Sequence, residues 1–169
     1  MSIKKIVLVV LFSFIFNFAN AEENLKSLGK FKDWESFVLS QDGNKVCFAQ
    51  STPLIRAPKK LKRDPSRLFV TFRPAEKITD EVSTTSGYEY NSQNSIIASS
   101  GKSKYKFDIA QDDFAWISSN KIEKRIIKRM KKASRIMVTG YNKSGSQTID
   151  HYSLMGFTKA YNAAKKSCT

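Results

Sequence analysis

The chain has 169 residues and a formal net charge of +14 at pH 7, because 29 Lys and Arg outnumber 15 Asp and Glu. This length suits one domain with its own core, and this charge favours anionic partners. The single histidine excludes most multi-histidine metal sites, and no P-loop, GxSxG or GxGxxG motif occurs, so we expect neither a metal nor a cofactor.

The first 21 residues have the three parts of a secretory signal peptide in the right order. Lys4 and Lys5 supply positive charge, residues 6–18 form an apolar stretch, and Ala19-Asn-Ala21 offers small residues for cleavage. The apolar stretch is too short for an ordinary membrane span, although an uncleaved N-terminal anchor is the alternative. We therefore expect cleavage after Ala21 and export to the periplasm, with the cell surface or secretion as further destinations, and no transmembrane span in the mature protein.

The mature part, residues 22–169, keeps 27 Lys and Arg against 15 acidic residues, a formal charge of +12. In an exported protein the available polyanions are lipid headgroups, surface polysaccharide and cell-wall polymer. The compartment therefore favours an anionic envelope surface or an envelope protein as partner, and no nucleic acid. The alternative is that the lysines only solvate the surface.

Cys47 and Cys168 are the only two cysteines. An even pair in an oxidising compartment predicts a disulfide bond, the alternative being two reduced, buried thiols. Neither cysteine lies in a CxxC motif, so a thiol-redox or zinc role has no support in the sequence.

Residues 22–30 are predicted as a polar leader, and residues 31–169 as a single domain. All four prolines fall between Pro53 and Pro74, which makes residues 53–66 a long irregular loop. Short strands rich in Val, Phe and Thr and separated by Gly, Ser, Asn and Asp turns are predicted at 34–39, 45–51, 67–73, 81–90, 95–99, 105–110 and 114–117. Their spacing favours antiparallel hairpins.

An amphipathic helix is predicted from Asn120 to Ala133, with Asn120 and Glu123 capping its start. A hairpin of residues 135–141 and 146–152 follows, and a second helix begins at about Leu154. The second helix has apolar residues at helical spacing, namely Phe157, Ala160, Tyr161, Ala164 and Cys168. The fold class is therefore mainly β (α+β), an antiparallel β-sandwich or partly open barrel with two helices in the C-terminal third and one disulfide.

A long stretch near the C-terminus carries a family resemblance. It runs from Gly140 through Asp150, continues with Tyr152-Ser-Leu154 and Gly156-Phe157, and ends at Cys168. Weaker matches are Asp33-Trp34, Lys45 to Ala49, Phe72-Arg-Pro74, Glu81-Val-Ser83 with Gly87-Tyr88, and Ala115-Trp116. The chain resembles the invasion-associated locus B family of exported bacterial proteins, which implies a periplasmic or surface location in a Gram-negative envelope, a β-rich fold and no established enzymatic reaction. Some members have a further cysteine near the Trp34 position that this chain lacks, so only one disulfide can form.

Two basic segments are candidate sites for an anionic or protein partner in a non-enzymatic envelope protein. The first is the loop 53–66, which carries Lys59, Lys60, Lys62 and Arg63. The second is the polar face of the first helix, which carries Lys124, Arg125, Lys128, Arg129, Lys131 and Lys132. The alternative for the helix is that its apolar face packs on the sheet while its lysines only meet water.

The alternative function is a hydrolase that acts on envelope carbohydrate through the close acidic residues Asp108, Asp112 and Asp113. These residues are also typical of turns between strands. The aromatic residues Tyr88, Tyr90, Tyr105 and Trp116 are interpreted as core or cross-strand pairs in preference to a sugar platform.

Overall fold

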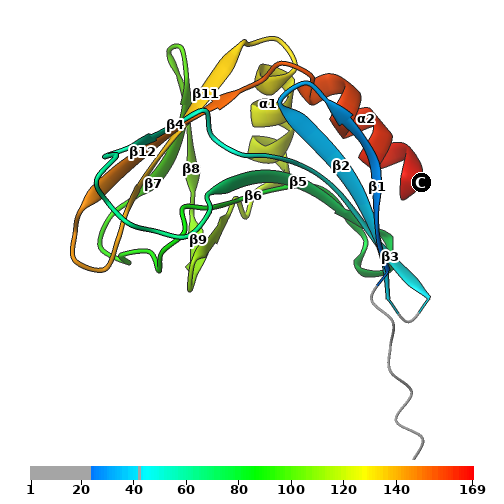
Figure 1. Cartoon of the computed structure of the whole chain (residues 1–169). Helices are drawn as coiled ribbons and strands as arrows, with labels where there is room; N and C mark the ends of the chain where they lie inside the picture. Colours follow the sequence, from blue (N-terminus) through cyan, green and yellow to red (C-terminus); the bar gives the residue numbers. More distant parts are fainter. Residues whose placement is uncertain (1–23, 42) are drawn as a thin grey trace, which may run out of the picture.

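The structure is a computed structural model that describes residues 24–41 and 43–169, so the predicted signal peptide lies outside the described residues. It has two antiparallel sheets and two helices (Figure 1). In chain order the elements are β1 (Asn24–Phe31), β2 (Trp34–Gln41), β3 (Asn44–Ser51), β4 (Ile55–Ala57), β5 (Arg67–Arg73), a 3-10 turn (Pro74–Glu76), β6 (Ile78–Thr85), β7 (Ile96–Ser100), β8 (Ser103–Phe107), β9 (Ile109–Gln111), β10 (Phe114–Trp116), α1 (Asn120–Met130), β11 (Arg135–Tyr141), β12 (Gln147–Ser153) and α2 (Phe157–Ser167).

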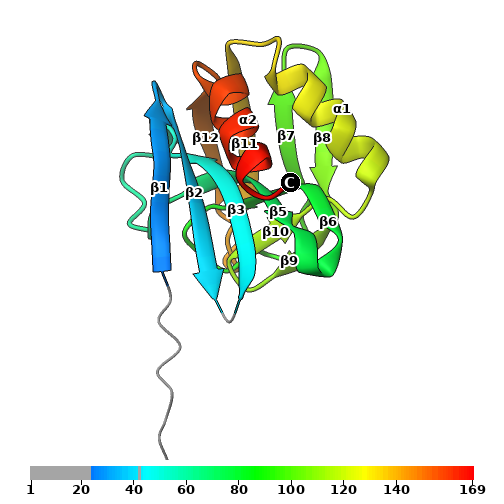
Figure 2. The same cartoon turned by 90° about the vertical axis from the view of Figure 1, so that its right-hand side faces the viewer.

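The larger sheet has seven strands in the order β1-β2-β3-β5-β6-β10-β9, and the smaller has five in the order β4-β12-β11-β7-β8. Neither order closes on itself, and both helices lie in the C-terminal third, so the predicted fold class is confirmed. In Figure 1 the larger sheet arches across the molecule, and Figure 2 shows α1 and α2 on the same side of it as the smaller sheet. Helix α2 packs on β1, β2, β3 and β5, and α1 packs on β6.

The hydrophobic core lies between these layers because each strand alternates apolar and polar side chains. The ring of Trp34 is 1% exposed and meets Phe157 of α2 edge-on at a centroid distance of 4.8 Å. The predicted apolar positions of the second helix are all buried up to Ala164, and Cys168 follows the end of α2 in a partly buried position. The buried side of α2 therefore packs against the face of the larger sheet that is turned toward the core.

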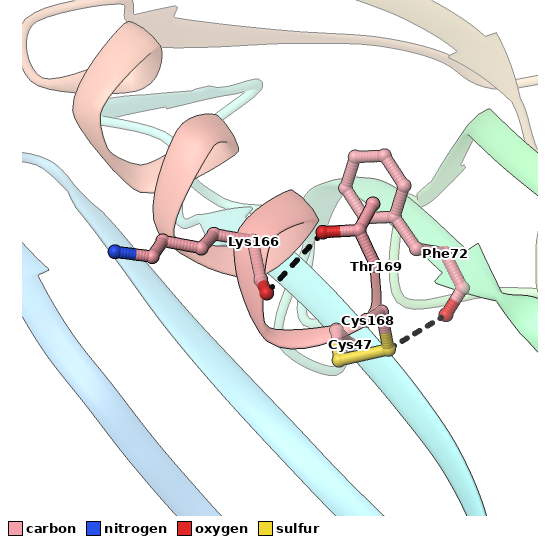
Figure 3. The surroundings of a disulfide bond; sticks show 5 residues. All are labelled: Cys47, Phe72, Lys166, Cys168 and Thr169. Atoms are coloured by element: carbon pink, nitrogen blue, oxygen red, sulfur yellow. Dashed lines mark hydrogen bonds between the residues drawn. A yellow bond between two sulfur atoms is a disulfide. The ribbon is translucent and has the colours of Figure 1, made fainter.

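The Cys47–Cys168 disulfide is present, as predicted, with the two Cα atoms 5.9 Å apart. It joins the end of α2 to β3 across 121 residues of sequence, as Figure 3 shows. The Sγ atom of Cys168 lies 3.7 Å from the carbonyl oxygen of Phe72. An oxidised sulfur carries no proton, so this approach is a packing contact and not a hydrogen bond.

Three predicted local features differ from the structure. The polar leader 22–30 is largely strand β1, which pairs with β2 at the edge of the larger sheet, where water can solvate one face of a polar strand. The loop 53–66 contains the short strand β4, which pairs with β12. Residues 86–90 leave the predicted strand 81–90 at Gly87, whose φ is +74°.

The predicted cap of the first helix does not form. Ser119, not Asn120, occupies the N-cap position, and no side chain caps the helix. The carboxylate of Glu123 instead points into the molecule and accepts a hydrogen bond of 2.9 Å from the backbone amide of Val82. Strand β10 ends at Trp116, so Glu123 satisfies an amide of β6 that has lost its strand partner.

The C-terminal stretch that carried the family resemblance contributes to the interior. Gly140 leaves no room for a Cβ, which would lie 2.8 Å from the hydroxyl oxygen of Tyr88. The hydroxyl of Tyr88 is hydrogen bonded to that of Thr148 at 2.6 Å. Gly156 has a φ of +92°, and a Cβ there would meet the carbonyl oxygen of Phe31 at 1.7 Å. These positions are therefore set by packing.

Candidate functional site

The predicted cations of α1 lie on its outer face. Its inner face is buried through Ile126, Ile127 and Met130. The predicted cations that are exposed are Lys124, Arg125, Lys128, Lys131 and Lys132. Arg129 is half-buried, and its Nε donates a hydrogen bond of 3.2 Å to the hydroxyl of Ser100. Five of the six predicted helix cations thus face solvent.

A hollow of 290 Å³ lies between α1 and α2, and several of these cations line it. The Nζ atom of Lys131 lies 3.8 Å from the centre of the Tyr161 ring, over its face. The Tyr161 hydroxyl donates a hydrogen bond of 2.5 Å to Asp80, the one acidic residue among those that line the hollow. Burial lowers the pKa of Lys131. The lysines of the hollow are Lys124, Lys128, Lys131 and Lys132.

The basic loop is a separate surface. Lys59, Lys60 and Lys62 are exposed. Figure 2 places the segment around β4, to which the loop belongs, on the far side of the molecule from α1. The two predicted basic segments are therefore not brought together.

Arg63 has to be removed from the predicted binding residues. Its side chain is 2% exposed and forms an ion pair with Asp150 of β12. Its Nη1 also donates to the carbonyl oxygen of Ser86 and the hydroxyl of Ser66, both at 2.7 Å. A buried guanidinium requires such partners, and they leave none of its charge for an external anion.

The three aspartates of the alternative hydrolase do not form a common site. Asp112 and Asp113 make the turn of the β9–β10 hairpin, whereas Asp108 precedes β9 at the opposite end of the hairpin. Asp108 accepts hydrogen bonds from the Ser118 hydroxyl and, at 2.8 Å, from the Ser118 amide, and these bonds lower the pKa of its carboxyl group. Asp113 accepts one of 3.3 Å from the Thr85 hydroxyl. These contacts suit turn residues, and nothing supports the hydrolase.

Two features of the larger sheet were not predicted. A cavity of 470 Å³ opens beside Trp116 and Glu123. Burial raises the pKa of Glu123 to about 7, the Val82 amide opposes the rise, and the charges of Glu81 and Asp80 add to it. The second feature is a row of half-buried aromatic rings on the sheet face turned away from the helices, formed by Phe37, Phe48, Phe69, Phe114 and Trp116.

Within residues 24–41 and 43–169, no helix has the length and apolar character needed to cross a bilayer. The same residues contain no group of three His, Cys, Asp or Glu side chains placed to hold a metal ion.

Comparison with known proteins assigns the chain to a family. The family model described as invasion associated locus B (IalB) protein matches residues 34–165, from the first residue of β2 to the last turn of α2. No curated protein and no solved structure shows significant similarity to the chain. Membership and the disulfide both indicate an exported protein of the cell envelope. The chain belongs to the invasion associated locus B family.

Proposed function

We propose that this protein binds an anionic surface of the envelope through the cations of α1, without catalysing a reaction. The observation that carries the proposal is the hollow between α1 and α2, where Lys124, Lys128, Lys131 and Lys132 converge around one carboxylate. Four like charges gathered in one hollow repel one another, and a bound anion relieves that repulsion.

The charges of α1 are not neutralised within the domain. The ion pairs of the described residues involve Arg63, Arg73 and Lys143, and none involves a cation of α1. Each cation held close to an anionic membrane contributes about 1 kcal/mol, and the attraction decays over about 10 Å at 0.1 M salt. The exposed cations of α1 together therefore suffice for measurable adhesion if they meet the surface at the same time.

Phosphate groups of lipids and charged groups of envelope polymers offer the same oxyanion chemistry to these lysines. A co-sedimentation assay with vesicles of phosphatidylglycerol, and a parallel assay with soluble polyphosphate, separates the two sources. We expect the protein to bind the anionic vesicles at low salt and to be released from them at high salt. It should not bind vesicles of neutral phosphatidylcholine.

Charge reversal locates the binding surface. The triple variant Lys124→Glu, Lys128→Glu and Lys132→Glu should lose binding. The matched control reverses the same number of exposed charges on β1 and β3 through Lys26→Glu, Lys30→Glu and Lys45→Glu, and it should retain most of the affinity. Equal losses in both variants would show that net charge alone drives adhesion and would reject a specific basic face.

A further inference from the structure

Cross-strand pairing places the aromatic row on one face of the larger sheet. Phe37 pairs with Phe48, while Phe69 and Trp116 both pair with Ser83. Directly opposed residues point to the same side of a sheet. The residues between them on the same strands face α2 and the core instead, as the burial of Ser36, Cys47, Val70 and Ala115 shows.

The rings of this row touch one another in sequence across the sheet. Phe37 stacks on Phe48 at a centroid distance of 5.2 Å, and Phe48 meets Phe69 at 6.2 Å. Phe114 lies 6.0 Å from Phe69 and stacks on Trp116 at 5.7 Å. None of the five is packed against the hydrophobic core. The row is thus a surface feature, and a continuous apolar strip on a soluble domain indicates a binding surface.

Exposed aliphatic residues extend the strip to both edges of the sheet. Ile109 of β9 is 47% exposed and pairs with Trp116. Leu25 of β1 is 56% exposed and pairs with Leu39. No helix or strand of the described chain covers this face, which is the underside of the arch in Figure 1.

The charge of this face is nearly balanced, unlike that of the whole domain. Strand register places three cations and two carboxylates on it, namely Lys30, Arg67, Arg73, Glu35 and Glu81. Arg73 and Glu81 hold each other through two hydrogen bonds of 2.9 and 2.7 Å. A polyanion gains little electrostatic attraction from such a surface. The charge of this face therefore suits an uncharged partner.

Hydrogen-bonding side chains lie between the rings. Gln50 pairs across the strands with Phe69, and Gln111 pairs with Phe114. Neither amide has a side-chain hydrogen bond among the described residues, so both are free to bind a partner. Such amides beside aromatic faces match a ligand with flat apolar faces and hydroxyl edges.

The row ends in the cavity of 470 Å³, where Trp116 and Ile109 form part of the wall. The Arg73–Glu81 pair also lines it. Glu123 is 4% exposed and lines the same cavity, and one of its oxygens is held by the Val82 amide. Its other oxygen has no hydrogen-bond partner among the described residues and can accept a bond from a ligand hydroxyl.

We propose that this face binds a neutral polysaccharide, with sugar rings stacked on the aromatic row and sugar hydroxyls bonded to Gln50, Gln111 and the groups of the cavity. The C–H face of a sugar is attracted to the negative face of an aromatic ring. A second copy of the chain is a weaker occupant, because a mature charge of +12 on each molecule opposes self-association.

Tryptophan fluorescence tests the proposal on the full mature protein. Trp34 is 1% exposed, so a spectral change on ligand addition reports Trp116. The probes are a soluble oligomer of β-1,4-linked N-acetylglucosamine and soluble dextran. We expect a saturable blue shift with at least one of these glycans, and no loss of affinity at about 1 M salt, where charges are screened within about 3 Å.

Ring replacement tests the row directly. Phe69→Leu keeps apolar volume but removes the ring, and should weaken glycan binding at least tenfold, whereas Phe69→Tyr should bind like the wild type. Tyr141→Ala, a half-buried aromatic of β11 in the smaller sheet, is the matched control and should not change affinity. Melting curves confirm that each variant is folded. The charge-reversed α1 variant should still bind glycan, which separates this surface from the proposed anion-binding face.

Three outcomes would overturn the proposal. The first is no response to either glycan. The second is unchanged glycan affinity in Phe69→Leu. The third is a dimer in light scattering that Phe69→Leu dissociates, which would assign the face to a second copy of the chain.

Discussion

Arg63 and Asp150 form an ion pair inside the domain, although Arg63 lies in the most basic loop of the sequence. The two side chains are 2% and 0% exposed. Arg63 Nη1 donates to the Asp150 carboxylate at 2.8 Å. The pair ties the loop that precedes β5 to β12 of the smaller sheet, within the stretch that identifies the family.

Arg63→Ala should lower the free energy of unfolding by about 3 to 5 kcal/mol, because it leaves the Asp150 carboxylate buried without a partner. Urea denaturation measures the loss. The control is Lys60→Ala in the same loop, where the side chain is exposed and the change should stay within about 0.5 kcal/mol. Similar values for both variants would show that the ion pair is not formed in solution.

The Cys47–Cys168 bond closes a loop of 121 residues. On the chain-entropy account its loss costs about 5 kcal/mol. We expect reductant to lower the urea midpoint of the wild type to that of the Cys47→Ala, Cys168→Ala double variant, which reductant should not affect. Mass spectrometry that finds two free thiols in protein purified from the periplasm would contradict the bond.

Phe157→Ala should cost about 3 to 5 kcal/mol, because the ring is fully buried and its removal leaves a cavity against Trp34. Thermal melting and urea denaturation measure this loss. The neighbouring Thr158→Ala is exposed and should have little effect. An unchanged melting temperature in Phe157→Ala would mean that this part of the family signature serves an external contact.

The raised pKa of Glu123 predicts a pH-dependent loss of stability. The folded-state pKa is about 7 and the ordinary value is 4.5, so the folded protein binds the proton more tightly than the unfolded chain. The penalty is absent below the ordinary pKa, grows as the pH rises through this interval, and reaches about 3 kcal/mol above the folded-state pKa.

Glu123→Gln should remove this penalty and keep the hydrogen bond from Val82. The difference in unfolding free energy between variant and wild type is therefore expected to rise between pH 4.5 and about 7 and then level off. Urea denaturation over that pH range measures it. A difference that does not change with pH would show that the pKa of Glu123 is the same in the folded protein and in the unfolded chain.

Local patterns in the sequence predicted most of the fold. The apolar periodicity of 157–164 identified the buried side of α2, and the even cysteine count identified the disulfide. The edge strand β1 and the short strand β4 were not predicted, because β1 is mostly polar and β4 has only three residues. The pairing of β4 depends on β12, which is distant in the sequence and which no local pattern reveals. The partner of β1 is the adjacent strand β2, but a polar edge strand lacks the apolar alternation that would mark it.

The sites were harder to predict than the fold. The outward cations of α1 follow from helical periodicity, but the burial of Arg63 depends on Asp150, 87 residues away. The aromatic row needs the register of five strands, β2, β3, β5, β6 and β10, because each strand alone has at most two aromatic residues. Trp116 was interpreted as a core or cross-strand aromatic, and its ring is half-buried, opposite Ile109 and stacked on Phe114.

Lysine acetylation with mass spectrometry, in the presence and absence of phosphatidylglycerol vesicles, tests the anion-binding face most directly. If α1 binds the surface, the vesicles will slow the acetylation of Lys124, Lys128 and Lys132. The acetylation rates of Lys26 and Lys45, whose side chains are also exposed, will not change. Protection spread evenly over all these lysines, or confined to those of β1 and β3, would contradict binding through α1.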